Sequence, residues 1–313
     1  MHAAAINLRG GVSPRNTRLR GQSIIEYVLI IAVIGLVIVF AGPGVAGAIR
    51  NQFNLVGNTL NSGTNGGTEG GGASGGGSTG ADSATVQAAI AKDAKDWTLG
   101  EQKAVAENIA AKGEASPAYA KAKAAMDANT KWSIKLTNGK TLEYRIIGIN
   151  HDNLADGSGK AGLTFETTND VLYLHIMNDT KTNVGGWRSS KLRARLNSGD
   201  LWALLPAELQ SKAKAVTKMT DNEGGGSAGT PTATNDKVFI LSTTEIYGYL
   251  QSDGTQYEYY AASRYSGPEI VCYFNTRSVS PSDSTDFFYV DPFGRCKSGS
   301  ANSAGNVFPA WCF

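Results

Sequence analysis

The chain has 313 residues, which is enough for one substantial domain and an additional anchoring segment. Only 18% of the residues are charged, and many of the 38 glycines are concentrated in one tract. The net charge is +2, but the first 21 residues alone contain four arginines and no acid, so the remainder is slightly acidic. This distribution excludes the basic surface that nucleic-acid binding requires.

An apolar run follows the arginine-bearing N-terminal segment. From residue 28 to residue 49 the chain has 22 residues without a charge. As a helix, this run spans about 33 Å at ~1.5 Å per residue, which matches a bilayer hydrocarbon core of about 30 Å. The preceding arginines predict that the N-terminus stays in the cytoplasm and that the rest of the chain is exported. Residues 22–61 are therefore predicted to form a membrane-spanning helix with a polar end.

An ordinary secretory signal peptide is one alternative for this region. Such a peptide needs a short apolar stretch that ends at small residues, and residues 43–48 offer a cleavage site of that kind. Against it, the apolar run is long and carries Glu26 near its start. A carboxylate within an apolar segment is costly and usually serves a function.

Residues 21–27 read Gly-Gln-Ser-Ile-Ile-Glu-Tyr, and this pattern resembles the processing site of Flp-type prepilins of the Tad branch of type IV pili. The resemblance implies that a membrane prepilin peptidase cleaves between Gly21 and Gln22, which makes residues 1–21 a leader. It also implies that Glu26 and Tyr27 take part in filament assembly with other pilin subunits. Pairing of the new Gln22 amine with the Glu26 carboxylate would avoid an unpaired charge in an apolar environment. An uncleaved signal anchor is the alternative.

Two segments separate this helix from the rest of the chain. Residues 62–80 are a Gly/Ser/Thr-rich flexible linker, with a typical reach of roughly 25 Å. Residues 81–130 are rich in alanine and lysine and predict two or three short helices, one of them begun by Thr98 as N-cap with Glu101 three residues later. This segment is expected to be a helical spacer or a layer packed against the following domain.

Residues 131–313 are predicted to form a globular exported head. Short strands are mixed with two helices, which predicts an α+β fold. A hairpin turn is expected at 137–140, and Leu192, Leu196 and Leu201 are expected to face inward. The predicted segments are strands 132–136, 142–149, 163–167 and 171–174, helices 189–205 and 206–219, a strand at 237–242, and short segments at 270–274, 287–290 and 307–313.

Residues 145–313 resemble a bacterial domain family of unknown function that occurs on surface and secreted proteins. The resemblance is carried by residues 148–153, 185–187, 236–242 and 257–260. Near the end, the Arg-Ser pair and the closing Pro-Ala strand also resemble C-type-lectin-like and formylglycine-enzyme-like domains. The resulting candidate ligand-binding residues are Trp187, Arg188, Arg277 and Trp311.

Catalytic and metal-binding patterns are missing from the sequence. It contains no H-E-x-x-H, G-x-S-x-G or Walker motif, so we expect neither an enzyme nor a cofactor. His151 with Asp152 and Asp156 offers metal ligands, but the spacing fails the EF-hand pattern and a polar turn is the preferred interpretation. His175 follows strand residues and is expected to be a packed histidine.

Two surface features are open to more than one interpretation. A basic helix face is either solvated or meets acidic glycans. The aromatic residues near the C-terminus either form the core or supply a binding surface. The basic residues are Arg188, Lys191, Arg193 and Arg195, and the aromatic ones are Tyr257, Tyr259, Tyr260, Tyr265, Tyr273, Phe274, Phe287, Phe288, Tyr289, Phe293 and Trp311.

The three cysteines, Cys272, Cys296 and Cys312, all lie in the last part of the head. Because an exported domain meets an oxidising environment, a disulfide between two of them is expected, with the pairing left open. The absence of a C-x-x-C motif argues against zinc and thioredoxin-like chemistry.

Together these features predict a minor pilin or pseudopilin of a Tad/Flp-type pilus whose head is a binding or adhesion module. Its expected partners are the prepilin peptidase, other pilin subunits, the membrane and a surface ligand, either glycan or protein. The protein is expected in the cell membrane before assembly, and then on the pilus or cell surface. The alternatives are an uncleaved membrane-anchored surface binding protein and an extracellular enzyme on a lectin-like scaffold.

Overall fold

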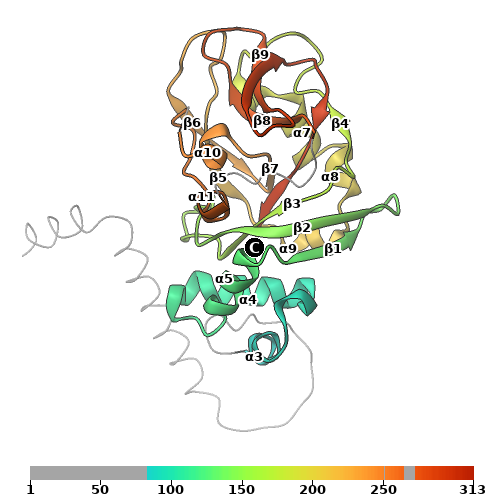
Figure 1. The fold of residues 1–313 in the computed structure, drawn as a ribbon, viewed down its shortest axis with the longest axis vertical. Coiled ribbons are helices and arrows are strands. Elements are labelled where there is room, and N and C mark those ends of the chain that lie inside the picture. The colour runs from blue at the N-terminus through green and yellow to red at the C-terminus, as the bar shows by residue number, and fades with distance from the viewer. Residues whose placement is uncertain (1–82, 250, 264–271) are drawn as a thin grey trace, which may run out of the picture. The chain divides into compact units, whose positions relative to one another are not determined.

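The computed structural model describes residues 83–249, 251–263 and 272–313, which form a mixed α/β globular unit (Figure 1). The prediction of a mixed α/β domain is confirmed at this level. The predicted leader, the helix at 22–61 and the linker at 62–80 lie outside the described residues. Within the described ranges, none of the helices has both the length and the hydrophobicity needed to cross a membrane.

The first elements form a helical layer. Its central helix, α4, begins with the predicted capping box: Thr98 Oγ1 accepts a hydrogen bond from the Glu101 backbone N–H, and the Glu101 carboxylate accepts one from the Thr98 N–H. It ends at Gly113, whose φ of 58° suits glycine. The elements are α3 (Ala84–Ala91), η1 (Ala94–Asp96), α4 (Leu99–Lys112), η2 (Gly113–Ala115) and α5 (Tyr119–Asp127).

The helical layer packs against a sheet rather than standing apart from it. The Trp97 and Trp132 rings stack with centroids 6.2 Å apart, and the Tyr144 hydroxyl donates to Gln102 Oε1 over 3.1 Å. Figure 1 shows α3, α4 and α5 together on one side of β1 and β2. Residues 81–130 were expected to form either a spacer or a layer packed against the following domain. In the structure, the described residues of this segment form the packed layer.

The sheet beneath these helices has the order β1-β2-β3-β12-β7, and all its pairs are antiparallel. The predicted hairpin is confirmed: β1 and β2 pair from Lys131↔Arg145 to Lys135↔Thr141, and Gly139 in the turn has a φ of 82°. The strands are β1 (Lys131–Lys135), β2 (Thr141–Ile149), β3 (Leu163–Thr167), β12 (Ala310–Cys312) and β7 (Val238–Phe239).

A second five-stranded sheet, with the order β10-β9-β8-β11-β4, lies at the other end of the unit from the helical layer (Figure 1). A two-stranded ribbon of β5 and β6 completes the β-structure of the described residues. These strands are β10 (Cys296–Ser300), β9 (Asp286–Val290), β8 (Phe274–Val279), β11 (Gly305–Asn306), β4 (Leu174–His175), β5 (Val216–Asp221) and β6 (Pro231–Asp236).

Short helices connect these strands, and they correct two predictions. The helix predicted at 189–205 is divided, because Ser190 caps a new helix and the chain turns at Gly199, although Leu192, Leu196 and Leu201 are buried as expected. The helix predicted at 206–219 stops at Lys212. The helices are α6 (Gly186–Ser189), α7 (Lys191–Asn197), α8 (Asp200–Leu204), α9 (Ala207–Lys212), α10 (Thr243–Tyr247) and α11 (Glu258–Ser263).

The strand predictions also need correction at several places. Met219 lies in β5, where β-branched neighbours such as Val216 and Thr220 favour an extended chain. The strand predicted at 171–174 does not form, because Tyr173 has a left-handed φ of 64°, and β4 holds only two residues. The strand predicted at 237–242 is likewise reduced to the two residues of β7. The tail segments are found as β8, β9 and β12, shifted by a few residues.

Candidate ligand-binding site

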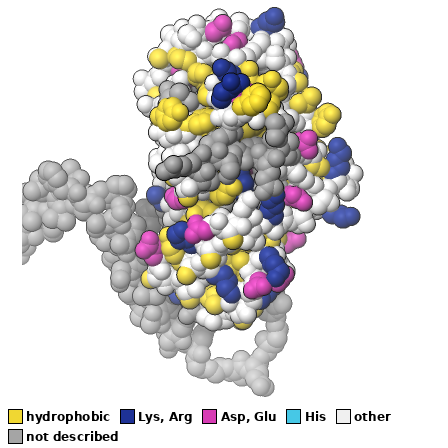
Figure 2. Space-filling model, in the orientation of Figure 1, with side chains coloured by type: hydrophobic (Ala, Val, Ile, Leu, Met, Phe, Trp, Pro, Cys, Tyr) yellow, Lys and Arg dark blue, Asp and Glu magenta, His cyan; other side chains and the backbone are white. Residues whose placement is uncertain are grey.

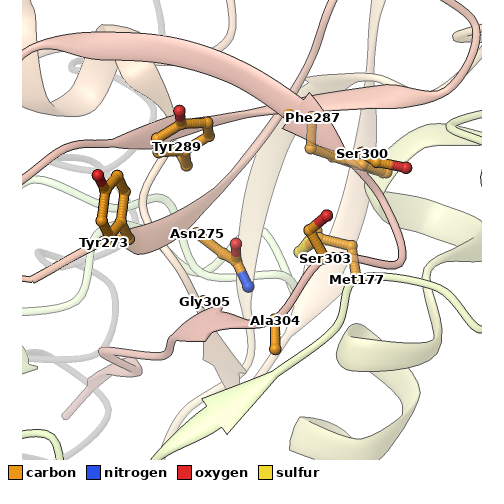
Figure 3. A pocket seen from close by; sticks show the side chains of 10 residues that line it. Met177, Tyr273, Asn275, Phe287, Tyr289, Ser300, Ser303, Ala304 and Gly305 are labelled. Carbon is orange, nitrogen blue, oxygen red and sulfur yellow. The ribbon is translucent and has the colours of Figure 1, made fainter.

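A cavity of about 250 Å³ opens on the outer face of the second sheet (Figure 3). Figure 3 shows Tyr273 and Tyr289 together at one side, Ser300, Ser303 and Met177 at the other, and Asn275 between them. Figure 2 shows hydrophobic side chains among those exposed on the upper part of the unit. The lining residues are Met177, Tyr273, Asn275, Phe287, Tyr289, Gly299, Ser300, Ser303, Ala304 and Gly305.

Strand register brings these side chains to one face of the sheet. Asn275 of β8 is paired directly with Tyr289 of β9, and Phe287 is paired with Gly299 of β10. Because side chains alternate along a strand, Tyr289 and Phe287 point to the same face. The intervening positions supply the core on the opposite face, where Phe274 and Val290 are buried.

Two glycines make room for the polar and aromatic groups of the cavity. A Cβ placed on Gly299 would lie 2.8 Å from Cε1 of Tyr289, and one on Gly305 would lie 2.6 Å from Oδ1 of Asn275. With a side chain at either position, the Tyr289 ring or the Asn275 carboxamide would have to move from its place in the cavity. Glycine at these positions therefore allows the Tyr289 ring and the Asn275 carboxamide to lie close over the neighbouring strands.

The cavity offers hydrogen-bonding groups that the described protein atoms leave unused. Asn275 Nδ2 donates to the His175 carbonyl over 2.8 Å, which orients the carboxamide and leaves its Oδ1 for another partner. Within the described residues, the hydroxyls of Tyr273, Tyr289 and Ser303 likewise have no hydrogen-bond partner. Burial and the neighbouring Tyr273 raise the pKa of Tyr289, so its hydroxyl is protonated and able to donate at neutral pH.

The sequence-based ligand-binding residues lie elsewhere, and three of them are corrected. Trp187, Arg277 and Trp311 have exposed fractions of 0%, so they cannot contact a ligand from outside. Trp187 Nε1 donates to Asp236 Oδ2 over 3.0 Å, and Trp311 belongs to the aromatic core. Arg188 is exposed, but its guanidinium donates to Thr232 of β6 and does not line the cavity.

Arg277 belongs to a buried network of two acids and two bases. Its guanidinium makes two hydrogen bonds to Glu245, one of them 2.8 Å long between Nη2 and Oε1. Lys218 Nζ lies 2.5 Å from Glu245 Oε1 and 2.6 Å from Asp152 Oδ1. Tyr257 and Thr164 also donate to the Asp152 carboxylate. We name the set Asp152, Lys218, Glu245 and Arg277 the buried charge network.

The pKa values in this network are shifted toward the ionised forms. Burial alone would raise the pKa of Asp152, but Lys218 outweighs it and holds this pKa well below its usual range. Burial is similarly outweighed at Glu245, whose pKa is lowered by Arg277 and Lys218. The network joins the chain after β2 to β5, α10 and β8. It therefore fixes β8, the strand that presents Asn275 to the cavity.

A second buried pair lies on the first sheet. Arg145 and Glu166 approach to 3.4 Å, and the Tyr260 hydroxyl donates to Glu166 Oε2 over 2.7 Å. The guanidinium also lies 4.0 Å from the centre of the Tyr259 ring. Tyr257, Tyr259 and Tyr260 therefore pack in the core against buried charged groups and do not form a binding surface.

The loop with His151 does not gather metal ligands. His151 Nδ1 lies 3.2 Å from Glu258 Oε1 and its Nε2 lies 3.1 Å from the Thr255 carbonyl, while Asp156 caps the turn at Ser158. Within the described ranges, no cluster of histidine, cysteine and acidic side chains has the arrangement of a metal site. His175, as expected, is packed, with Nε2 at 2.8 Å from the Leu172 carbonyl.

Three of the four basic residues predicted to form a surface face on and near α7 make salt bridges. Arg193 pairs with the buried Asp236, Arg195 with Asp200, and Lys191 with Asp179. These three cations are therefore neutralised locally, whereas Arg188 donates to the uncharged Thr232 hydroxyl. Arg188 and Lys191 are exposed, so the interpretation as a solvated face agrees with the structure, and the binding of acidic glycans stays a prediction without support from these pairs.

The three cysteines are free thiols in the structure, so the expected disulfide is not formed. Cys312 is fully buried, with its Sγ 3.4 Å from both Thr164 Oγ1 and Asp152 Oδ2. Cys272 and Cys296 are half-buried. Burial raises the pKa of Cys296 to about 12, which keeps this thiol protonated and unreactive at neutral pH.

Protonation of His151 gives a prediction about pH. Burial opposes its charge, but Glu258 and Asp152 outweigh burial and raise its pKa. A raised pKa in the folded state contributes stability that is complete below the unfolded value near 6.5 and is lost as the pH rises through the folded value. We expect the urea midpoint of the wild-type chain to fall between pH 6 and pH 9 more than that of His151→Gln. Equal slopes in the two proteins would contradict this assignment.

The cavity lies in the part of the chain that matches a known domain family. Residues 161–313 match the family described as a domain of unknown function (DUF6273). All the residues that line the cavity fall in this segment. Comparison with curated proteins and with solved structures gives no match for the chain.

The aromatic pattern of the C-terminal region indicates only part of the cavity lining. The aromatic C-terminal region was noted, and the structure divides it: Tyr273 is 55% exposed at the cavity, whereas Phe274, Tyr257 and Trp311 are buried. Tyr265 lies outside the described residues. Asn275, Ser303 and the two glycines were missed. The alternation of Tyr273 with Asn275, and of Phe287 with Tyr289, is the signal that would have placed them on one face.

Proposed function

We propose that this chain is a minor pilin or pseudopilin of a Tad/Flp-type pilus that displays a ligand-binding domain outside the cell. Two separate features support the proposal. The segment 21–27 followed by the uncharged run 28–49 supports membrane insertion and prepilin processing. The cavity on the second sheet supports binding by the folded unit.

The cavity is the observation that carries the binding role. It joins the rings of Tyr273 and Tyr289 to polar atoms that have no partner within the described residues, namely the two tyrosine hydroxyls, the Ser303 hydroxyl and Asn275 Oδ1. Pockets of this composition are typical of ligand sites. Its two serines, Ser300 and Ser303, have no histidine or carboxylate beside them among the described lining residues. The lining therefore fits recognition better than the nucleophilic catalysis that the enzyme alternative requires.

Cleavage of the leader by the prepilin peptidase is the feature that distinguishes the proposed pilin from an uncleaved surface anchor. The experiment that tests it is identification of the mature N-terminus of the chain isolated from its native host. We expect cleavage between Gly21 and Gln22, because the apolar helix then remains attached to the exported domain and is available for filament assembly. The folded unit would be carried outside the membrane by the linker at 62–80.

A further inference from the structure

We propose that the cavity binds one neutral sugar ring of a glycan. This inference rests on the proposed binding role of the cavity and does not depend on how the N-terminus is processed. It combines the size of the cavity, the arrangement of its two tyrosines, its unpaired polar groups and the absence of charge from its described lining.

The size of the cavity limits the ligand to about one ring. Its volume is about 250 Å³. Sites for drug-sized ligands run from roughly 300 to 1,000 Å³, so this cavity lies below that range. A monosaccharide unit fits this limit. The rest of a glycan would extend into solvent through the mouth of the cavity.

The two tyrosines provide surfaces suited to the apolar face of a sugar. The ring centroids of Tyr273 and Tyr289 lie 5.7 Å apart, with their planes inclined by 56°. Each residue combines an apolar ring with a polar hydroxyl, as a pyranose combines a C–H face with hydroxyl edges. Gly299 leaves space for the Tyr289 ring, since a Cβ there would lie 2.8 Å from Cε1 of the ring.

The polar groups of the cavity are donors and acceptors of the kind that sugar hydroxyls bind. The bond from Asn275 Nδ2 to the His175 carbonyl leaves Oδ1 as an acceptor, and Figure 3 shows that oxygen on the cavity side, between Tyr289 and Ser303. The Ser303 hydroxyl can donate or accept. A sugar offers neighbouring hydroxyls that do both, so it can satisfy these groups together, whereas an apolar side chain of a peptide would leave them unpaired.

The lining contains no charged side chain among its described residues. A carboxylate or phosphate held there would lose water without gaining a cationic partner, and that loss is costly. The cavity therefore favours neutral hexoses and N-acetylhexosamines over sialic acid, uronic acids and phosphorylated sugars.

The test is saturation-transfer difference NMR on the purified full-length chain in detergent. The probes are methyl glycosides of glucose, galactose, mannose and N-acetylglucosamine, with the methyl glycosides of sialic acid and glucuronic acid as acidic counterparts. We expect saturation transfer to at least one neutral probe and to neither acidic probe. Failure of every neutral probe, or binding of an acidic probe alone, would overturn the sugar assignment.

Matched variants locate the binding. Tyr289→Ala is expected to weaken the affinity for the neutral probe by about tenfold or more, because one stacking face is lost. Tyr289→Phe keeps the ring and guards against a folding defect, so it should retain more affinity than Tyr289→Ala. Phe293→Ala changes a side chain that is 80% exposed outside the cavity, and it should leave binding unchanged. Equal affinities for Tyr289→Ala and the wild type would overturn the proposed site.

Failure of this inference can be told apart from failure of the proposed function. A tyrosine-rich or tryptophan-rich peptide serves as an additional probe. If that peptide binds and Tyr289→Ala abolishes its binding, the cavity is a binding site for protein segments and the sugar assignment is wrong. Identification of the mature N-terminus reports on display independently of either result.

Discussion

Replacing Glu245 with alanine is expected to lower the free energy of unfolding by about 3–5 kcal/mol. Glu245 is 1% exposed and is the shared partner of Arg277 and Lys218. Without it, Lys218 keeps the Asp152 carboxylate, but among the described residues Arg277 has no hydrogen-bonded carboxylate left, and a buried charge that loses its partner is strongly destabilising. Urea unfolding of the full-length chain, followed by tryptophan fluorescence, measures the change.

An exposed ion pair provides the matched control for this experiment. Glu107 pairs with Lys103 one helical turn away on α4, and their side chains are 41% and 29% exposed. Glu107→Ala should cost at most about 0.5 kcal/mol, because solvent screens the pair. The double variant Glu245→Ala/Arg277→Met should recover part of the loss, since it removes the guanidinium that Glu245→Ala leaves without its carboxylate and keeps the Lys218–Asp152 pair. A cost for Glu245→Ala as small as that for Glu107→Ala would show that the network is not a stabilising unit.

The network also predicts how its contribution changes in acid. Asp152 and Glu245 have folded-state pKa values below their ordinary values of 3.8 and 4.5. Their contribution to stability is therefore present above those ordinary values and is lost as the pH falls through the lower folded values. The wild-type chain should accordingly approach the stability of Glu245→Ala only in strong acid.

Gly162→Ala is expected to destabilise the folded unit by about 1–3 kcal/mol or more. A Cβ on Gly162 would lie 1.8 Å from the backbone oxygen of Ala106 in α4. Because the obstacle is helix backbone rather than a flexible side chain, either α4 or the chain entering β3 must move. The substitution thus tests whether the helical layer is an integral part of the unit. Its effect is measured by thermal and urea unfolding of the full-length variant.

Gly100 offers the same chemical change without the clash. It lies in the first turn of α4, where the nearest atom to an added Cβ, Thr98 Oγ1, is 3.9 Å away. Gly100→Ala should therefore be neutral or stabilising by about 0.4–1 kcal/mol, because alanine restricts the unfolded chain. If both substitutions have the same small effect, the helical layer does not pack against the sheet as described.

Local patterns were sufficient to predict several elements. The capping residues Thr98 and Glu101 are three positions apart, so the start of α4 could be recognised from sequence. The hairpin of β1 and β2 was likewise marked by alternation and by Gly139 in its turn. Where prediction failed, as in the chain before β4, the left-handed Tyr173 depends on tertiary contacts that a propensity argument does not contain.

The buried charge network shows why Arg277 could not be recognised as a core residue from the sequence. Arg277 is a candidate ligand-binding residue in the sequence because its Arg-Ser pair resembles that of lectin-like domains. Its partner Glu245 lies 32 positions away along the chain, and Lys218 comes from a third element. Only the fold brings these groups together, so burial with full neutralisation was not visible in the local pattern.

The cavity could not be predicted from the sequence either, because its lining residues are brought together by strand pairing. Tyr289 and Asn275 are neighbours through strand pairing, and β11 joins β8 through a parallel contact formed by Asn306 and Phe274. The sequence indicated aromatic residues in this region, but which of them face outward depends on the register of three strands. The two glycines that make room for the cavity become meaningful only once their facing side chains are known.

The most direct test of the proposed function is mass spectrometry of the N-terminal peptide of the chain from its native host, with and without the prepilin peptidase. We predict a mature chain that begins at Gln22 in the parent strain and an intact leader in the peptidase mutant. A first residue within 45–49 would mean ordinary secretion and would contradict the pilin assignment. An intact leader in both strains would contradict it as well, and would leave an uncleaved surface anchor carrying the same binding domain.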